Sequence, residues 1–212
     1  MVDIKSMSNK KKVEYICEYY KLHIIGVLAV IFIVASLIHG QITKIDYVFN
    51  LTLIGNNVDE NKKNDLESQL GRIVIKEGGQ KKQAIIDVIP LEGSSKATAS
   101  MSSVSTQKFI ARVSVGEIDV VILKKSMFES YAKQGMFLGL ENIKELNLQG
   151  IKNKKIEAVG SDNIKSVYAI NAEDIKILKN MGFDTGTLVI GIISSCKQKD
   201  KATTVIKWLL NK

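Results

Sequence analysis

Histidine is missing from most of this chain, because both histidines, His23 and His39, lie within the first 40 residues. Everything that follows therefore lacks the imidazole that a Ser-His-Asp site, a Cys-His site or a histidine-ligated zinc site requires. The sequence contains no P-loop and no GxGxxG pattern. Its two cysteines, Cys17 and Cys196, are too few for a disulfide framework. We therefore predict a protein without catalytic residues, cofactor or metal.

Arginine is almost absent as well. Of the 30 basic residues only Arg72 and Arg112 are arginine, against 22 acidic residues and a net charge of +8. Arginine reads phosphates and base edges through its planar fork, and aromatic residues make up only 6% of the chain, so we predict no nucleic-acid partner. The lysine excess has two interpretations: solvated surface lysines, or a diffuse basic surface that favours anionic lipid or cell-wall polymer.

One long apolar run stands near the N-terminus. Residues 22–38 read LHIIGVLAVIFIVASLI, without Asp, Glu, Lys or Arg. As a helix these residues measure about 26 Å, close to the ~30 Å of a hydrocarbon core, so we predict a transmembrane helix over residues 22–39 that contacts the lipid bilayer. Lysines gather before the run, at Lys10, Lys11, Lys12 and Lys21. The positive-inside rule then places the N-terminus in the cytoplasm.

The predicted organisation has four parts: a basic cytoplasmic segment (1–21), the transmembrane helix (22–39), a short linker (40–45) and an extracellular domain (46–212) of a cell-membrane protein. A cleaved signal peptide is the alternative, since Val34-Ala35-Ser36 is a passable cleavage site. The length of the apolar run favours an uncleaved single-pass anchor.

The remainder alternates between strand and helix patterns. Apolar runs predict strands over 47–54, 84–90, 119–123, 166–170 and 188–194, and helical spacing predicts helices over 58–75, 106–116, 126–135, 171–181 and 201–210. Ser126 and Glu129 form a capping-box pattern, and Asn171 is a candidate N-cap. Residues 141–164 have no clear assignment. The alternation predicts an α/β fold with a mostly parallel sheet flanked by helices.

In open α/β sheets, ligands bind beyond the carboxyl ends of the strands. The residues expected there carry amides, hydroxyls and two ammonium groups, which suit a small anionic or sugar-like ligand: Gly55, Asn56, Asn57, Ser94, Ser95, Lys124, Lys125 and Ser126. Asp87 and Asp119 stand in two predicted strands and raise the alternative of a paired-carboxylate hydrolase. Structural roles for both carboxylates are the favoured interpretation.

Residues 108–140 carry a family resemblance. Their pattern includes Gly116, Glu117, Asp119, Phe128, Tyr131, Ala132, Gly135 and Phe137. It resembles the first lobe of extracellular solute-binding proteins of the type II periplasmic-binding class, and residues 190–210 resemble the returning segment of the same class. The first 40 residues are similar to those of small membrane proteins of Gram-positive type that carry such a domain. The resemblance implies a single lobe, because residues 141–187 are too few for a second.

Two functions follow from these patterns. The first is a non-catalytic binding or sensing module held at the membrane, related to solute-binding proteins. The alternative is a scaffold or interaction subunit that docks a membrane protein partner and has no small ligand. The missing second lobe favours the alternative, while the polar residues expected at the strand ends favour the first.

Overall fold

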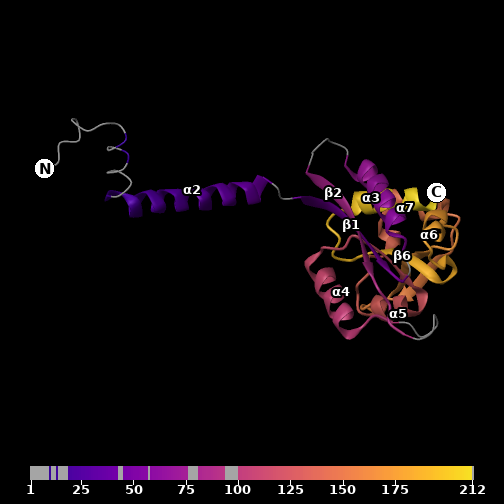
Figure 1. Ribbon diagram of the computed structural model, residues 1–212. Helices are drawn as coiled ribbons and strands as arrows, with labels where there is room; N and C mark the ends of the chain where they lie inside the picture. The colour runs from indigo at the N-terminus through magenta and orange to yellow at the C-terminus, as the bar shows by residue number, and fades with distance from the viewer. Residues whose placement is uncertain are drawn as a thin grey trace. The chain divides into compact units, whose positions relative to one another are not determined.

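The computed structural model describes residues 10, 13, 19–42, 45–56, 58–75, 81–93 and 100–211. It forms two units, Met1–Ile45 and Asp46–Lys212. The first contains helix α2 (Lys21–Ile42), 22 residues and therefore about 33 Å long. Within α2, which is labelled in Figure 1, the stretch Lys21–Gly40 is long and apolar enough to cross a membrane.

The second unit is built on one six-stranded sheet with the order β2-β1-β3-β6-β5-β4. The strands are β1 (Asp46–Ile54), β2 (Lys82–Ile89), β3 (Val120–Lys124), β4 (Lys155–Val159), β5 (Lys165–Asn171) and β6 (Leu188–Ile192). The five strand predictions are confirmed to within a few residues. Strand β4 falls in the segment 141–164 that had no assignment, together with the short 3₁₀ turns η2 (Leu140–Asn142), η3 (Lys144–Leu146) and η4 (Leu148–Gly150).

The sheet is mixed, so the prediction of a mostly parallel sheet was wrong. Strand β1 pairs in parallel with β2 and with β3, but β3–β6, β6–β5 and β5–β4 are antiparallel. Buried apolar runs such as Val120–Leu123 and Leu188–Ile192 look alike in either direction, because both faces of the sheet are covered. The carboxyl end of β6 therefore lies where β1, β2 and β3 begin. We call that side of the sheet the amino edge and the opposite side the carboxyl edge.

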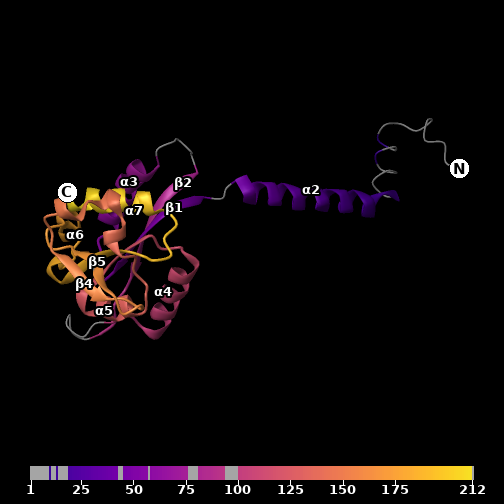
Figure 2. The same cartoon turned by 180° about the vertical axis from the view of Figure 1, so that it is seen from behind.

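Helices cover both faces and bury two cores. Helices α3 (Glu60–Val74), α6 (Lys176–Asn180) and α7 (Lys199–Leu210) pack on one face, through residues such as Leu70, Leu178 and Val205. Helices α4 (Ser103–Val115) and α5 (Lys125–Lys133) pack on the other, through residues such as Phe109 and Phe128. Figure 2 shows α4 apart from α3 and α7. Such burial, at roughly 1.5–3 kcal/mol for a large apolar side chain, stabilises the layers.

Two local predictions were wrong. Ser126 lies inside α5 instead of before it, and the N-cap residue, Lys124, makes no side-chain capping bond. Asn171 ends β5 and accepts a hydrogen bond from the Glu173 amide at 2.7 Å, while α6 begins at Lys176. An Asn or Ser followed by acidic residues suits an Asx turn or a helix interior as well as a cap, so the pattern alone does not fix the helix start.

Candidate functional site

The structure describes five of the residues predicted at the carboxyl edge. Gly55 and Asn56 follow β1, Lys124 ends β3, and Lys125 and Ser126 are exposed in the first turn of α5. Asn57, Ser94 and Ser95 lie outside the described residues. The five described residues line none of four prominent cavities in the described part of the chain.

Asn56 and Gly55 have structural partners at this edge. The Asn56 side chain donates to the Leu91 carbonyl and accepts from the Leu91 amide, both at 2.6 Å, so it links the chain after β1 to the chain after β2. A Cβ on Gly55 would stand 2.5 Å from the Phe183 ring, so the ring fills the space beside this glycine. Asn56 and Gly55 therefore both have structural roles at the carboxyl edge.

A denser polar network lies at the amino edge, around Asp119. Its carboxylate accepts hydrogen bonds from the Asn50 backbone amide at 2.9 Å and from the Cys196 thiol at 3.2 Å. The Asp119 backbone amide donates to the Asn50 backbone carbonyl at 3.1 Å. The Asp119 carbonyl accepts from the Ile193 amide at 3.0 Å. Asp119 thus joins β1 to the start of β3 and to the chain that leaves β6.

Burial sets the ionisation of this network. Asp119 is 6% exposed, and desolvation raises the pKa of its carboxyl group above the usual value, against the opposing effect of the Asn50 amide. Burial, followed by the charge of Asp119, raises the pKa of the Cys196 thiol to about 12. Cys196 is therefore a protonated thiol at neutral pH and donates its hydrogen to Asp119, which makes it a poor nucleophile.

Next to this network a cavity of about 560 Å³ opens on the face that carries α4. Asp87 of β2 receives hydrogen bonds from the Asn50 side chain at 3.0 Å and from the Arg112 guanidinium of α4. The Nε atom of Arg112 also donates to Glu117 at 3.2 Å. The cavity lining combines these charged groups with one aromatic ring: Tyr47, Val48, Asn50, Ile85, Asp87, Arg112, Gly116, Glu117, Asp119, Lys197 and Gln198. We call it the Arg112 pocket.

Local structure explains how Arg112 reaches the pocket. Helix α4 ends at Gly116, which adopts a left-handed conformation with φ of 71°, and the chain then turns into β3. A Cβ on Gly116 would stand 2.9 Å from the Ser195 carbonyl, so the loop after β6 approaches this turn closely. The Ser195 hydroxyl donates to the Val113 carbonyl in the last turn of α4. The turn therefore fixes Arg112, Glu117 and the loop after β6 together.

The sequence predicted a ligand site at the carboxyl edge, whereas the Arg112 pocket lies at the amino edge, although two signals for this pocket were present. Asp87 interrupts an apolar strand, and Arg112 is one of only two arginines. The paired-carboxylate alternative needs Asp87 and Asp119 on adjacent strands, but β1 runs between β2 and β3. Asn50 of β1 binds both carboxylates, through its side chain and its backbone amide.

The described residues contain no group of three or more His, Cys, Asp or Glu side chains arranged to hold a metal ion. In the Arg112 pocket, Asp87 faces a guanidinium and Asp119 faces an amide and a thiol. What the pocket offers is hydrogen-bonding groups of both kinds, acceptors on the carboxylates and donors on Arg112 and Lys197.

Comparisons with known proteins place this chain in no family. No family model matches it, and no curated protein matches it. One solved structure, described as "Extracellular solute-binding protein family 1 from Alicyclobacillus acidocaldarius subsp. acidocaldarius DSM 446", is similar to it over 60% of this chain and 28% of that chain, with 15% sequence identity and a TM-score of 0.34. The chain thus spans less than a third of that protein, and a TM-score of this size carries no conclusion about ligand or partner.

Proposed function

We propose that this protein is a membrane-anchored, non-catalytic binding module that holds a neutral, hydroxyl-rich ligand such as a sugar in the Arg112 pocket. The observation that carries the proposal is the composition of this cavity. It sets three carboxyl groups, two cations, two amide side chains and the Tyr47 ring around about 560 Å³. That volume lies within the range of small-molecule sites.

The charges in the pocket favour a neutral ligand over an anionic one. Asp87 and Glu117 already bind Arg112, and Asp119 adds a third carboxyl group, so the acids outnumber Arg112 and Lys197. An anion would meet this excess at close range, whereas hydroxyl groups can donate to carboxylates and accept from a guanidinium. The Tyr47 ring, 56% exposed, offers an apolar face for a sugar ring to cover.

Helix α2 supports the anchor. Its side chains from Leu22 to Ile38 are not buried, and large apolar side chains such as Phe32 (76%) and Leu22 (82%) are exposed. A contiguous exposed apolar surface of this kind is typical of a membrane contact. With the lysines on its N-terminal side, the helix favours an N-terminus in the cytoplasm and an extracellular domain. Extraction with alkaline carbonate and protease digestion of intact cells test both parts: the protein should stay with the membrane, and a C-terminal tag should be cut from outside.

Ligand binding is tested on the full chain in detergent micelles, with thermal unfolding read from Trp208 fluorescence. A panel of neutral sugars and matched sugar acids is added at up to about 10 mM, which detects even millimolar affinity. We expect a rise in melting temperature with one or more neutral sugars and none with their acids. Titration calorimetry then gives the affinity.

Tyr47→Ala removes the exposed ring without opening a core, and we expect it to weaken sugar binding about ten-fold. Ile164→Ala is the matched control, because Ile164 is 61% exposed and lies outside the pocket. A chain that no sugar stabilises, or a Tyr47→Ala variant that binds as tightly as the parent, refutes the sugar site. A stoichiometric membrane protein that co-purifies with an unresponsive chain would favour the scaffold function instead.

A further inference from the structure

A second cavity at the amino edge is basic. It measures about 450 Å³ and lies on the face of the sheet that carries α3 and α7. One wall is apolar and comes from the end of α3, and the other comes from the start of β2 and the start of α7. Its lining is Val48, Ile73, Val74, Ile75, Lys82, Lys197, Gln198, Lys199, Asp200, Lys201 and Thr204. We call it the lysine groove.

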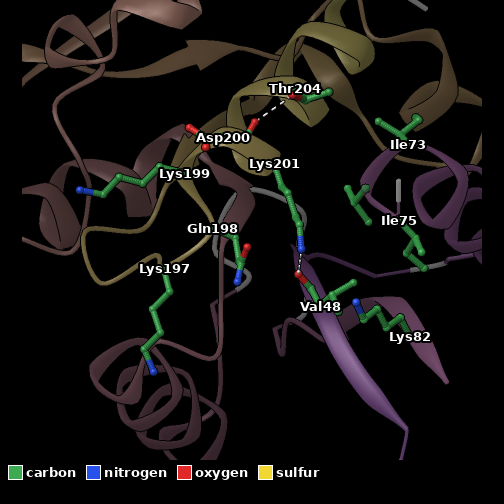
Figure 3. A pocket seen from close by; sticks show the side chains of 11 residues that line it. Val48, Ile73, Ile75, Lys82, Lys197, Gln198, Lys199, Asp200, Lys201 and Thr204 are labelled. Carbon is green, nitrogen blue, oxygen red and sulfur yellow. Dashed lines mark hydrogen bonds between the residues drawn. The ribbon is translucent and has the colours of Figure 1, made fainter. Parts of the chain in front are cut away.

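The lysine groove carries four cations and one acid among the described residues that line it. In Figure 3, Lys201 extends to the Val48 carbonyl, 3.4 Å from its Nζ atom, and Lys82 lies next to Val48. Lys199, the first residue of α7, extends away from the groove, while Lys197 in the preceding loop donates to the Val115 carbonyl at 3.3 Å. Within the described part of the chain, no acidic side chain forms an ion pair with Lys82, Lys197, Lys199 or Lys201.

The linker between α2 and β1 is short. Three residues lie between Ile42 and Asp46, and the four Cα–Cα steps limit the distance between the last residue of α2 and the first residue of β1 to about 15 Å. Asp46 pairs with Lys82 across the first rung of the sheet, and Val48 follows two residues later. If α2 spans a bilayer, the short linker limits how far Asp46 and its partner Lys82 can lie from the end of α2.

We propose that the lysine groove is a contact surface for the anionic lipid headgroups of the membrane that holds α2. The inference rests on the anchor in the proposed function and does not require the sugar site, although Lys197 and Gln198 line both cavities. Anionic headgroups attract lysines that stand near the surface, and the attraction fades beyond a Debye length of about 8 Å at physiological salt. Lys197 and Lys201 donate to backbone carbonyls, and none of the four lysines has an acidic partner among the described residues, so several separate ammonium groups face a multivalent anionic surface. This contact would hold the amino edge of the domain against the membrane surface.

The test uses the full chain in lipid nanodiscs and measures amine acylation of each lysine by mass spectrometry. One set of discs contains phosphatidylcholine alone, and the other contains phosphatidylglycerol as about a third of its lipid. We expect acylation of Lys82, Lys197, Lys199 and Lys201 to slow about five-fold in the anionic discs and to recover in high salt. Lys125 and Lys133, exposed in α5 and away from the groove, should react equally in both.

A pair of double variants provides the matched comparison. Lys82→Gln/Lys199→Gln should abolish the protection of Lys197 and Lys201, while Lys125→Gln/Lys133→Gln removes the same charge and should leave it intact. Equal acylation of the groove lysines in the two kinds of disc overturns the inference while leaving the anchor standing. Protection by dissolved glycerol phosphate in phosphatidylcholine discs also overturns it, in favour of a small-anion site. A chain that does not enter discs at all refutes the anchor, and the inference with it.

Discussion

Replacing Asp119 tests the polar network that joins three strands. Asp119→Ala leaves the buried Asn50 amide without its acceptor at 2.9 Å and the Cys196 thiol without its acceptor at 3.2 Å. A buried backbone donor without a partner costs about 1–3 kcal/mol, and the missing side chain adds a small void. Because removal of a desolvated carboxylate offsets part of this cost, we expect a net loss of about 1–3 kcal/mol, or roughly 2–12 °C in melting temperature.

Asp119→Asn separates hydrogen bonding from charge. The amide oxygen can still accept from the Asn50 amide, so we expect this variant to lie within about 1 kcal/mol of the parent at pH 7. Burial raises the pKa of the folded-state Asp119 carboxyl above its usual value of 3.8. The folded state therefore binds its proton more tightly, and the contribution of Asp119 to stability is complete below pH 3.8 and is lost as the pH rises through the folded-state pKa.

The assay is denaturant unfolding of the full chain in micelles, followed by Trp208 fluorescence at a series of pH values from about 3.5 to 7. The stability of Asp119→Asn relative to the parent should rise with pH across this range, since other carboxyl groups cancel in the difference. Equal destabilisation by the alanine and asparagine variants, or a difference that stays flat with pH, would refute the assignment of Asp119 as a buried acceptor with a desolvated charge.

Three further predictions follow from single contacts. In a Cys17→Ser background, Cys196 should resist a thiol reagent at pH 8 and react only on unfolding, because it is 3% exposed and its pKa is about 12; fast labelling of the native chain would contradict this. Gly55→Ala should destabilise the protein by about 1–3 kcal/mol in a thermal melt, since its Cβ would stand 2.5 Å from the Phe183 ring. Gly71→Ala in α3 is the control: its nearest neighbour is 3.9 Å away, so the same melt should show a stabilisation of up to about 1 kcal/mol. Asn56→Ala should lower stability by about 1–3 kcal/mol through the loss of two bonds to Leu91 and leave sugar affinity unchanged; a loss of affinity would return the ligand to the carboxyl edge.

Local sequence patterns predicted the elements of this fold but not how they pair. Apolar runs such as Val120–Leu123 show that a strand is buried on both faces, which is why the strands were found. Their direction depends on the path of the connecting chain, which composition does not record. The antiparallel direction of β6 was missed for this reason. Strand β4 was missed for another: it is an edge strand in which only Ile156 is buried, so its sequence shows no apolar run.

The candidate site was missed because its contacts join residues far apart in the chain. Asn50 and Asp119 are 69 residues apart, and Asp119 and Cys196 are 77 apart. The sequence did mark Asp87 and Asp119 as carboxylates in strands, and it marked Arg112 as one of two arginines. No pattern within a single element indicated that Asn50 would stand between the two carboxylates and bind both.

The direction of β6 determines where the Arg112 pocket forms. The rule that ligands bind at the carboxyl ends of strands assumes that those ends share one edge. Here β6 runs against β3, with Val120 opposite Ile192, so the loop that leaves β6 returns to the amino edge. It brings Cys196 to Asp119, Lys197 and Gln198 to both the Arg112 pocket and the lysine groove, and Lys201 to Val48. A parallel β6 would have carried all of them to the opposite edge, away from the residues that follow α2.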